Sequence, residues 1–295
     1  MLSSLHHRVR TTPWLGRVVL KSIPDLKWHI NVDPVGKMAI RLRQHRLYWL
    51  RPPLLWEGFM LGALQRFIRK GDVVYDIGAN IGLYSRFMVQ RFGASHVYAF
   101  EPMENNRSLF AENLRIAGCT STVSIIPCAV SNEDGTCDFQ IDDLTSNSGT
   151  LDAVTHGAAS QSRAQYGLPP ATVRVRVARL DTLVETQELP KPDVIKLDVE
   201  GAEALALQGA KSLLSRHRPR LVIELHGADV ARQVLQVLWS VGYRCFGYEN
   251  DGKSYGEFTP ADLNRITGLY TVHYLAASAD PSDMIQPIEN FSVTH

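Results

Sequence analysis

From Asp72 onward the chain alternates between short runs rich in β-branched residues and amphipathic stretches that suit helices. Such alternation is typical of repeated βα units, which build a mostly parallel sheet flanked by helices. It predicts an α/β domain over residues 54–295. The predicted strands are Val73–Ile77, His96–Phe100, Val123–Val130, Val194–Val199, Leu221–Leu225, Tyr243–Tyr248 and Leu269–Ala276. The predicted helices cover residues 54–69, 82–92, 103–117, 202–216 and 228–241.

One segment interrupts this alternation. Residues 131–181 contain a predicted strand pair, Thr136–Ile141 and Thr172–Ala178, on either side of a polar stretch over residues 142–170. Loops of that length in compact domains are either disordered or functional. Residues 142–170 are therefore predicted to form a lid or a substrate-binding loop.

The N-terminal part differs from the rest in charge. Residues 1–70 hold 13 Lys and Arg against 3 Asp and Glu, whereas residues 71–295 hold 18 against 27, and the two nearly cancel to a net charge of +1. Two alternating runs around Asp33-Pro-Val-Gly36 predict a β-hairpin over residues 27–43. The first 24 residues have loosely helical apolar spacing and no acid. They fit a helix packed on its own domain, a helix on an anionic membrane, or a transit peptide.

No apolar run reaches the roughly 18 to 20 residues that span a bilayer. The four cysteines lack CxxC spacing and the density of a disulfide scaffold, which favours a reducing compartment and argues against zinc. We therefore expect a cytoplasmic protein. Its basic N-terminal extension, residues 1–53, carries the hairpin and allows peripheral contact with a membrane.

The strongest local motif is a strand that ends in an acid and leads through a glycine loop into a helix. It reads Asp76-Ile-Gly78-Ala-Asn80-Ile-Gly82, and its glycines would let backbone N–H groups and a helix N-terminus approach a ligand. The spacing differs from the GxGxxG of pyrophosphate-binding enzymes, and Asp76 would repel a diphosphate. An acid there suits the cationic amino-acid group of S-adenosylmethionine. We predict that Asp76, Gly78, Asn80 and Gly82 bind this cofactor; the alternative is a plain βα turn.

A second acid, Glu101, ends the next predicted strand, 19 residues beyond Gly82. An acid at the tip of that strand is the usual acceptor for two ribose hydroxyls, which predicts a nucleoside ligand. Pro102 also favours a helix start at this place, and one strand end can serve both purposes.

A third motif runs from Asp193 to Glu203. Lys196, Asp198 and Glu200 recur in it at a period of two, so the three share one side of a strand. A lysine buried in a central strand needs an acidic partner, and Glu224 on the following strand is the one we expect. Lys196, Glu203 and Glu224 therefore fit a structural network of ion pairs.

Position favours catalytic roles for Asp198, Glu200 and His226. His226 ends the strand that follows Asp198, and the carboxyl ends of adjacent strands are where open α/β sheets bind ligands. A positioned base assists a hydroxyl nucleophile, and either Asp198 or His226 fits that role, with the pKa of a free imidazole near roughly 6.5 favouring His226. A divalent metal ion held by all three residues is the less favoured alternative.

Together these segments resemble the FkbM family of S-adenosylmethionine-dependent methyltransferases over about residues 55–230. The motifs that carry the resemblance are Asp76-Ile-Gly-Ala-Asn-Ile-Gly82, Phe100-Glu-Pro102, Cys128-Ala-Val-Ser131 followed by Gly135, Asn147-Ser-Gly-Thr150, Arg179-Leu-Asp-Thr-Leu183, Ile195-Lys-Leu-Asp-Val-Glu-Gly-Ala-Glu203 and Ile223-Glu-Leu-His226. The family implies a class I, Rossmann-like methyltransferase fold with a seven-stranded, mostly parallel sheet and an antiparallel last strand. It also implies methyl transfer to a hydroxyl, often on a sugar or a polyketide-like molecule. With this donor we expect the adenine near Ser131.

Two rival functions draw on other features. The basic N-terminal part, residues 1–70, would suit a methyltransferase that acts on nucleic acids. Enzymes that methylate the exocyclic amines of bases, however, usually carry Asn/Asp-Pro-Pro-aromatic after the fourth strand, where this chain has Asp198-Val-Glu-Gly201. The net negative charge of residues 71–295 also argues against a surface that binds the phosphate backbone of a nucleic acid. A non-catalytic module that only binds S-adenosylmethionine is disfavoured by the intact cofactor motifs. We expect a small-molecule or carbohydrate acceptor, with no nucleic-acid partner and no metal.

Overall fold

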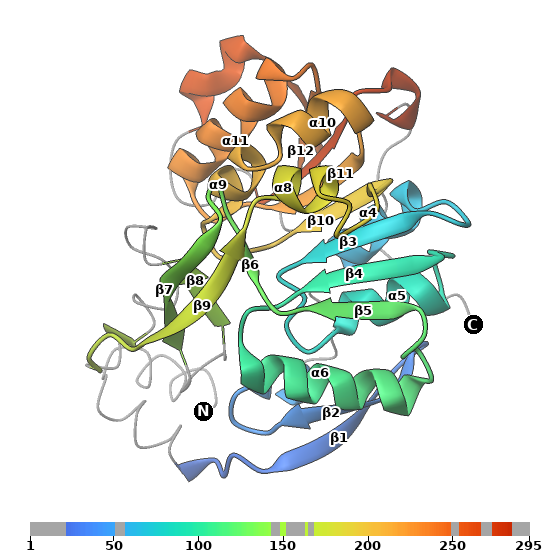
Figure 1. Cartoon of the computed structure of the whole chain (residues 1–295), viewed down its shortest axis with the longest axis vertical. Coiled ribbons are helices and arrows are strands. Elements are labelled where there is room, and N and C mark those ends of the chain that lie inside the picture. The colour runs from blue at the N-terminus through green and yellow to red at the C-terminus, as the bar shows by residue number, and fades with distance from the viewer. Residues whose placement is uncertain are drawn as a thin grey trace, which may run out of the picture.

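The computed structural model describes residues 22–50, 57–142, 148–151, 163–164, 168–248, 254–266 and 273–284. Its centre is an eight-stranded sheet in the order β13-β12-β14-β11-β10-β3-β4-β5 (Figure 1). Five neighbouring strands from β11 to β5 are parallel, while β14 runs antiparallel between β11 and β12. The strands are β3 (Val73–Ile77), β4 (His96–Phe100), β5 (Val123–Ile126), β10 (Val194–Leu197), β11 (Arg220–Glu224), β12 (Arg244–Tyr248), β13 (Ser254–Phe258) and β14 (Tyr274–Ser278). This arrangement confirms the predicted Rossmann-like architecture.

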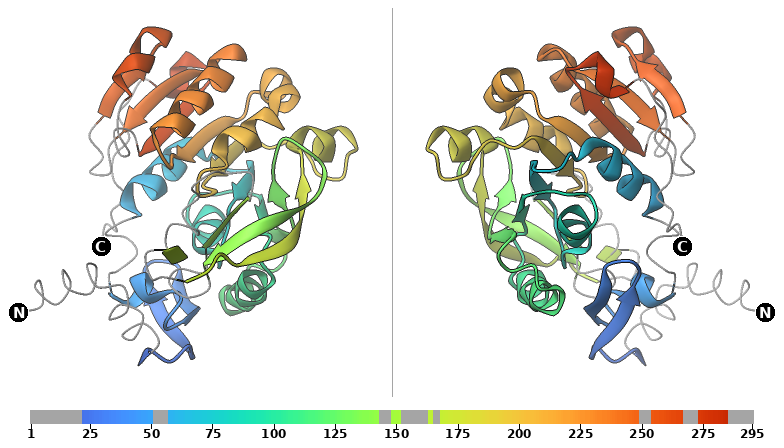
Figure 2. Two further views of the ribbon diagram at one scale, coloured as in Figure 1. Left: turned by 90° about the vertical axis from the view of Figure 1, so that its left-hand side faces the viewer. Right: turned by 90° about the vertical axis from the view of Figure 1, so that its right-hand side faces the viewer.

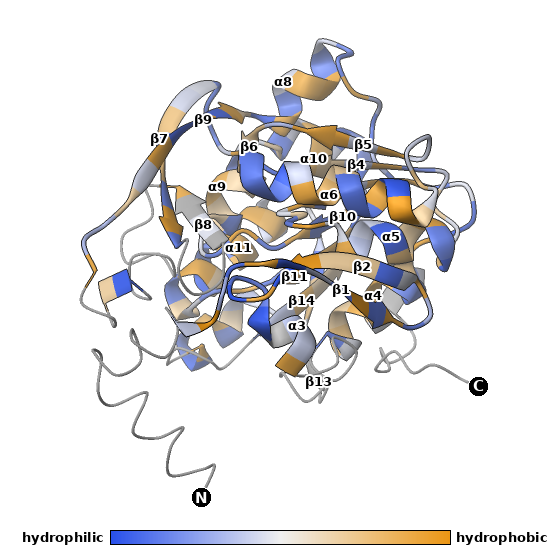
Figure 3. Ribbon diagram, turned by 90° about the horizontal axis from the view of Figure 1, so that it is seen from below, coloured by the Kyte–Doolittle hydropathy of each residue, from blue (hydrophilic) through white to orange (hydrophobic). Residues whose placement is uncertain are grey.

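Helices cover both faces of the sheet (Figure 2). Neighbouring residues of β3 point to opposite faces, so Val74 joins one core and Tyr75 the other. The first core takes α4 (Gly58–Phe67), α5 (Leu83–Gln90) and α6 (Glu104–Ala117). The second takes α8 (Leu180–Glu185), α9 (Glu203–Gln208), α10 (Lys211–His217) and α11 (Ala228–Ser240). α6 carries both hydrophobic and hydrophilic residues, as a helix with one buried face does (Figure 3).

The predicted N-terminal hairpin is present as β1 (Lys27–Val32) and β2 (Gly36–Arg41), followed by the short helix α3 (Arg46–Leu50). The hairpin lies against α6 (Figures 1 and 2). Asn113 of α6 holds it there: its side chain accepts the N–H of Ala39 at 2.7 Å and donates to the carbonyl oxygen of Ala39 at 3.1 Å. The same amide donates to the Ile81 carbonyl at 2.9 Å, which ties the hairpin to the loop after β3. The helix predicted at the extreme N-terminus falls largely in residues 1–21, outside the described residues.

A second sheet of four strands stands beside the main one, in the order β6-β9-β7-β8 (Figure 1). Its strands are β6 (Ala129–Val130), β7 (Gly135–Asp142), β8 (Ser148–Leu151) and β9 (Thr172–Ala178). The antiparallel pairing of β7 with β9 confirms the predicted strand pair. Most of the predicted loop over residues 142–170 lies outside the described residues, apart from its two ends, β8 and residues 163–164.

Three predicted elements need correction. The single strand predicted over Val123–Val130 is wrong, because β5 ends before Pro127, which has no N–H for the ladder, and the chain then enters the second sheet. The helix predicted over residues 202–216 is two helices, separated around Gly209, whose Cα packs so closely that an added Cβ would lie 2.0 Å from the Ser131 carbonyl oxygen. The main sheet has eight strands rather than seven, because β13 pairs with β12.

The helices α3 and α8 and the strand β13 were not predicted. None of the helices in the described ranges is long and apolar enough to cross a membrane.

Candidate active site

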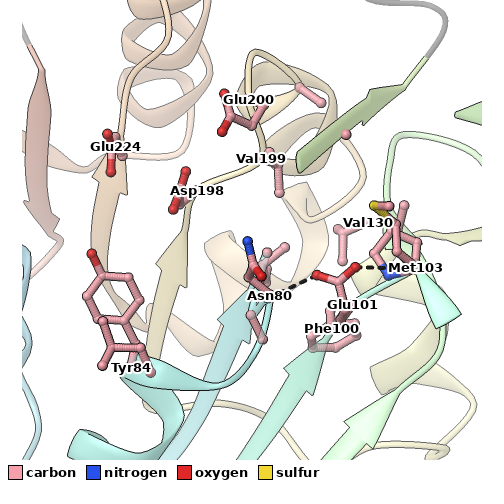
Figure 4. Close-up of a pocket in the computed structure, with 18 of the residues that line it drawn as sticks. Asn80, Tyr84, Phe100, Glu101, Met103, Val130, Asp198, Val199, Glu200 and Glu224 are labelled. Carbon is pink, nitrogen blue, oxygen red and sulfur yellow. Dashed lines mark hydrogen bonds between the residues drawn. The ribbon is translucent and has the colours of Figure 1, made fainter. Parts of the chain in front are cut away.

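A pocket of about 280 Å³ opens at the carboxyl ends of β3, β4, β10 and β11 (Figure 4). This is where open α/β sheets place their ligands. Six of the nine residues predicted from the sequence as site residues line it: Gly78, Asn80, Glu101, Asp198, Glu200 and His226. The other three, Asp76, Gly82 and Ser131, lie behind its walls.

Ser131 does not face the pocket. It is buried, its hydroxyl donates to the Asn132 side chain at 3.3 Å, and its carbonyl packs against Gly209. The preceding residues 128–130 form that part of the wall instead. Ser131, predicted from the sequence to lie near an adenine, is therefore not among the residues that line this pocket.

The loop after β3 uses its backbone N–H groups internally. Those of Gly78 and Ala79 donate to the carbonyl oxygen of Phe100 at 3.1 and 3.0 Å. That of Asn80 donates to Oε2 of Glu101 at 2.9 Å. These three N–H groups are thus already paired, contrary to the expectation that the loop would offer them to a ligand.

The two glycines of this loop serve packing within the protein. Both have positive φ, +78° at Gly78 and +86° at Gly82. A Cβ on Gly78 would lie 1.8 Å from the carbonyl oxygen of Asp198, and one on Gly82 would lie 2.0 Å from the Phe110 ring. Glycine is required at both positions because Asp198, which follows β10, and α6 approach the loop closely.

Glu101 is buried at the end of β4, and its side chain points between Asn80 and Met103 (Figure 4). Oε2 accepts the N–H of Asn80 at 2.9 Å, and Oε1 accepts that of Met103 at 2.8 Å. Burial raises the pKa of this carboxyl to about 7, although these hydrogen bonds favour the ionised form. The Asn106 side chain also hydrogen-bonds to this carboxylate, so Glu101 is held in place by three donors and keeps acceptor capacity for a ligand hydroxyl.

Lys196 pairs with a different acid from the one expected. Its Nζ lies 3.2 Å from Oδ1 of Asp76 and 3.5 Å from Oδ2 of Asp198, whereas Glu224 acts on it only from farther away. Register explains the difference, because Lys196 stands directly opposite Asp76 on β3 but opposite Val222 on β11. The predicted Lys196–Glu224 pair is therefore wrong.

Asp76 lies beneath the pocket. Its side chain is fully buried, accepts a hydrogen bond from the Ser85 hydroxyl at 2.6 Å and faces Lys196. Lys196 in turn donates to the carbonyl oxygen of Gly78 at 2.9 Å. Asp76 thus positions the lysine that supports the loop, rather than touching a ligand in the pocket.

His226 stands among four carboxylates. Nδ1 lies 2.8 Å from Oε1 of Glu203, while Nε2 lies 3.8 Å from Asp198, 3.7 Å from Glu200 and 3.9 Å from Glu224. Burial disfavours a charged ring, but the bond to Glu203 and the neighbouring acids outweigh it and raise the pKa of His226 well above its usual value. These surroundings favour the protonated imidazole, whereas the base proposed from the sequence would have to be the neutral form.

Glu57 and Tyr84 are pocket residues that the sequence did not reveal. Glu57 precedes α4 and accepts a hydrogen bond from the Tyr84 hydroxyl in the buried wall near Lys196. Burial raises the pKa of Glu57 to about 8, against the effect of that hydrogen bond. Lys196 Nζ lies 4.8 Å from the centre of the Tyr84 ring. The sequence does not reveal this role of Glu57, because it is a single acid at the start of an apolar helix and its surroundings come from other parts of the chain.

The pocket also draws on the N-terminal extension and on the second sheet. His45, just before α3, lines it, as do Phe139 of β7 and Gly149 and Leu151 of β8. Gly149 and Leu151 belong to the predicted lid segment. Both sides of the predicted boundary between extension and domain therefore contribute to one cavity.

Within the described ranges, no group of three or more His, Cys, Asp or Glu side chains is arranged to hold a metal ion. Asp198, Glu200 and Glu224 follow or end β10 and β11. Across the cavity from them lie the loop after β3 and, at the end of β4, Glu101 (Figure 4). Such groups can accept hydrogen bonds from hydroxyls and take up a proton.

Sequence comparisons identify the family. Residues 76–245, more than half of the chain, match the model of the methyltransferase FkbM domain. The hexuronic acid methyltransferase AglP of Haloferax volcanii is 27% identical over 64% of this chain and 71% of its own length. Methyltransferase sdnD of Sordaria araneosa is 28% identical over 46% of this chain and 59% of its own. The 31-O-demethyl-FK506 methyltransferase FkbM of Streptomyces tacrolimicus is 27% identical over 56% and 69%. The chain belongs to the FkbM methyltransferase family.

Proposed function

We propose that the protein transfers the methyl group of S-adenosylmethionine to a hydroxyl oxygen of a small molecule or of a sugar within a glycan. The observation that carries the proposal is the layout of one pocket. Glu101 and the loop at Gly78 and Asn80 lie on one side, and Asp198 and Glu200 lie on the other (Figure 4).

The residues of the pocket suit this methyl donor. Glu101 has acceptor capacity left for a ribose hydroxyl, and the wall at residues 128–130 is apolar, as an adenine ring requires. Asn80 also lines the pocket, where its side chain lies beside the His45 ring. When bound, S-adenosylmethionine supplies a methyl carbon made electrophilic by the adjoining sulfonium.

Asp198 is the residue that we assign as the proton acceptor. As an acceptor hydroxyl forms its new bond to carbon, its proton becomes strongly acidic, so an ordinary carboxylate suffices to take it. Lys196 Nζ, 3.5 Å away, orients the Asp198 carboxylate, while burial raises the pKa of Glu200 and of Glu224 beside His226. Alignment of the hydroxyl in the pocket supplies much of the remaining acceleration.

The chemistry of the walls supports a polyhydroxylated acceptor. Glu57, Asp198, Glu200 and Glu224 all line the pocket, and carboxyl groups are good partners for sugar hydroxyls. Two relatives point the same way, since AglP is a hexuronic acid methyltransferase and FkbM is a 31-O-demethyl-FK506 methyltransferase.

The test is transfer of labelled methyl groups from S-adenosylmethionine to fractionated glycans, lipids and RNA from cells. We expect label in carbohydrate or another hydroxyl-bearing small molecule, as an O-methyl ether. Label only in RNA would favour the nucleic-acid alternative. Tight binding of S-adenosylmethionine without transfer to any fraction would favour a non-catalytic module.

Peripheral membrane contact is a second proposal, supported by the extension. Four of the six exposed large hydrophobic side chains in the described chain are Leu26, Trp28, Trp49 and Leu50. Tryptophan and basic residues together suit the interface of an anionic membrane. Sedimentation with anionic vesicles should therefore carry the protein down, and Trp28→Ser should weaken this. Equal recovery in the supernatant with and without vesicles would contradict the proposal.

A further inference from the structure

The N-terminal extension exposes large apolar side chains on two of its elements. Leu26 and Trp28 lie at the start of the hairpin, and Trp49 and Leu50 end α3. These four side chains are between 41% and 60% exposed, although most large apolar side chains of a folded protein are buried. We call them the extension patch.

Hydrogen bonds bring the two parts of the extension patch together. The N–H of Leu42 donates to the carbonyl oxygen of Leu26 at 3.0 Å, which extends the ladder of β1 and β2 by one residue. Nε1 of Trp49 donates to the carbonyl oxygen of Leu42 at 2.7 Å. Leu26 and Trp28 are two residues apart along the extended chain, so their side chains share one side of the hairpin. The patch is therefore one surface.

Positive charge surrounds this surface. The described part of the extension holds five Lys and Arg against two Asp. Asp25 lies 3.6 Å from Arg41 and 3.7 Å from Arg43, so one carboxylate faces two guanidinium groups. Lys27 pairs with Glu112 of α6 at 2.8 Å. An excess of positive charge remains beside the apolar side chains.

An anionic bilayer fits this combination. It offers apolar depth to leucine and tryptophan side chains, and negative head groups to the basic residues. Tryptophan is also typical of the interface between membrane and water. Residues 1–21 suit the patch less well as a cover, because they hold four Lys and Arg and no acid and would add positive charge to a positive surface.

The helix α3 connects the extension patch with the pocket. Its residues Arg46 and Tyr48 line the pocket, whereas Trp49 and Leu50 are exposed. Five helical residues span only about 7 Å along the helix axis. The hairpin and α3 lie on the same side of the molecule, the side seen in Figure 3. A bilayer that takes up the patch therefore lies close to the wall of the pocket.

We propose that the extension patch docks on an anionic bilayer and that the acceptor hydroxyl belongs to a molecule anchored in that bilayer. The inference rests on the proposed methyl transfer and membrane contact, and it names the source of the acceptor. The acceptor is then an amphiphile whose hydroxyl-bearing head group enters the pocket from the membrane surface.

Vesicle binding tests the docking. The full chain is sedimented with vesicles of phosphatidylcholine, with and without phosphatidylglycerol. We expect binding only to the anionic vesicles, and weaker binding as the salt concentration rises. Trp49→Ser and Leu50→Ser should each weaken it about tenfold, because a large apolar side chain no longer enters the bilayer. Val173→Ser, which removes a side chain as exposed as Trp49 from β9, should bind as the wild type does.

Methyl transfer tests the source of the acceptor. Washed cell membranes and the soluble cell extract are each incubated with the protein and labelled S-adenosylmethionine. We expect the label in the lipid extract of the membranes, as an O-methyl ether. Trp49→Ser and Leu50→Ser should reduce this label in proportion to their loss of vesicle binding. Both variants should bind S-adenosylhomocysteine as the wild type does, because neither side chain lines the pocket.

Other outcomes would overturn the inference. Label confined to soluble glycans or metabolites, in equal amounts for the wild type and both variants, would do so and leave the proposed function standing. Label in lipid that neither variant reduces would show that the extension patch is not the docking surface. A dimer that Trp49→Ser dissociates, without binding to any vesicle, would assign the patch to a second copy of the chain. If no fraction is labelled and S-adenosylhomocysteine does not bind, the proposed function fails, and the inference fails with it.

Discussion

Nζ of Lys196 lies 3.2 Å from Oδ1 of Asp76, and neither side chain has any exposure to solvent. The pair joins β10 to β3 at the register position where the two residues face each other. Lys196 also donates to the Gly78 carbonyl and approaches Asp198, so one buried cation connects the sheet, the loop after β3 and the wall of the pocket.

Lys196→Met should therefore be strongly destabilising. Removing one partner of a buried ion pair leaves an uncompensated charge, which typically costs about 3 to 5 kcal/mol of unfolding free energy. Adding Asp76→Asn should restore part of this loss, because the orphaned charge is then gone. Urea unfolding followed by circular dichroism measures both, with Lys191→Met at an exposed position as the control. If Lys196→Met alone is as stable as the wild type, the ion pair contributes nothing to the free energy of unfolding.

Gly78→Ala and Gly36→Ala form a matched comparison. Both glycines have a φ of +78°, but a Cβ would meet the Asp198 carbonyl oxygen at 1.8 Å in one case and nothing within 4 Å in the other. Positive φ alone costs about 1 to 3 kcal/mol, so Gly36→Ala should lose that much. Gly78→Ala should lose clearly more and should weaken donor binding, because β3 and β10 must separate. Equal unfolding free energies for the two variants would contradict the close approach.

Donor affinity should depend on pH through Glu101. Its pKa is raised to about 7 by burial, and only the ionised form accepts from the backbone and the ribose together. Binding should weaken as pH falls below 7, approaching tenfold per unit, and level off above it. Titrating S-adenosylhomocysteine between pH 5.5 and 8.5 measures this. Glu101→Gln should bind weakly and lose the inflection; an unchanged profile in that variant would assign the titration to another group.

Asp198→Asn should slow the chemical step and spare donor binding. Loss of a general base typically reduces turnover by about 10² to 10⁴. Affinity for S-adenosylhomocysteine should stay within about threefold, since Asp76 still pairs with Lys196. Asp229→Asn on the exposed start of α11 serves as the control. A turnover in Asp198→Asn close to that of the wild type, measured by labelled methyl transfer, would remove Asp198 as the base.

The sequence predicted elements well where a local pattern decides the structure. β3 and β4 have the predicted bounds, because short apolar runs between glycine loops and helices leave little choice. Prediction failed where the chain changes sheets: residues 123–130 read as one strand, since strand propensity does not reveal which sheet a residue joins. Gly209 likewise breaks a helix because of its contact with Ser131, which is distant in sequence.

The positions of the site residues could likewise be predicted only where the sheet topology alone decides them. Glu101, Asp198 and His226 stand at strand ends, so topology alone brings them to one edge of the sheet. The partner of Lys196 depends on strand register, which the sequence does not display. Glu57 and His45 reach the pocket only through packing of the N-terminal part on the domain, so no spacing rule identifies them.

The most direct test of the account is a crystal structure of the protein with S-adenosylhomocysteine bound. The account predicts the ribose hydroxyls on Glu101 and the sulfur open toward Asp198. A ligand whose ribose lies away from Glu101, or whose sulfur faces away from Asp198, would contradict the assignment of this pocket as the site of methyl transfer.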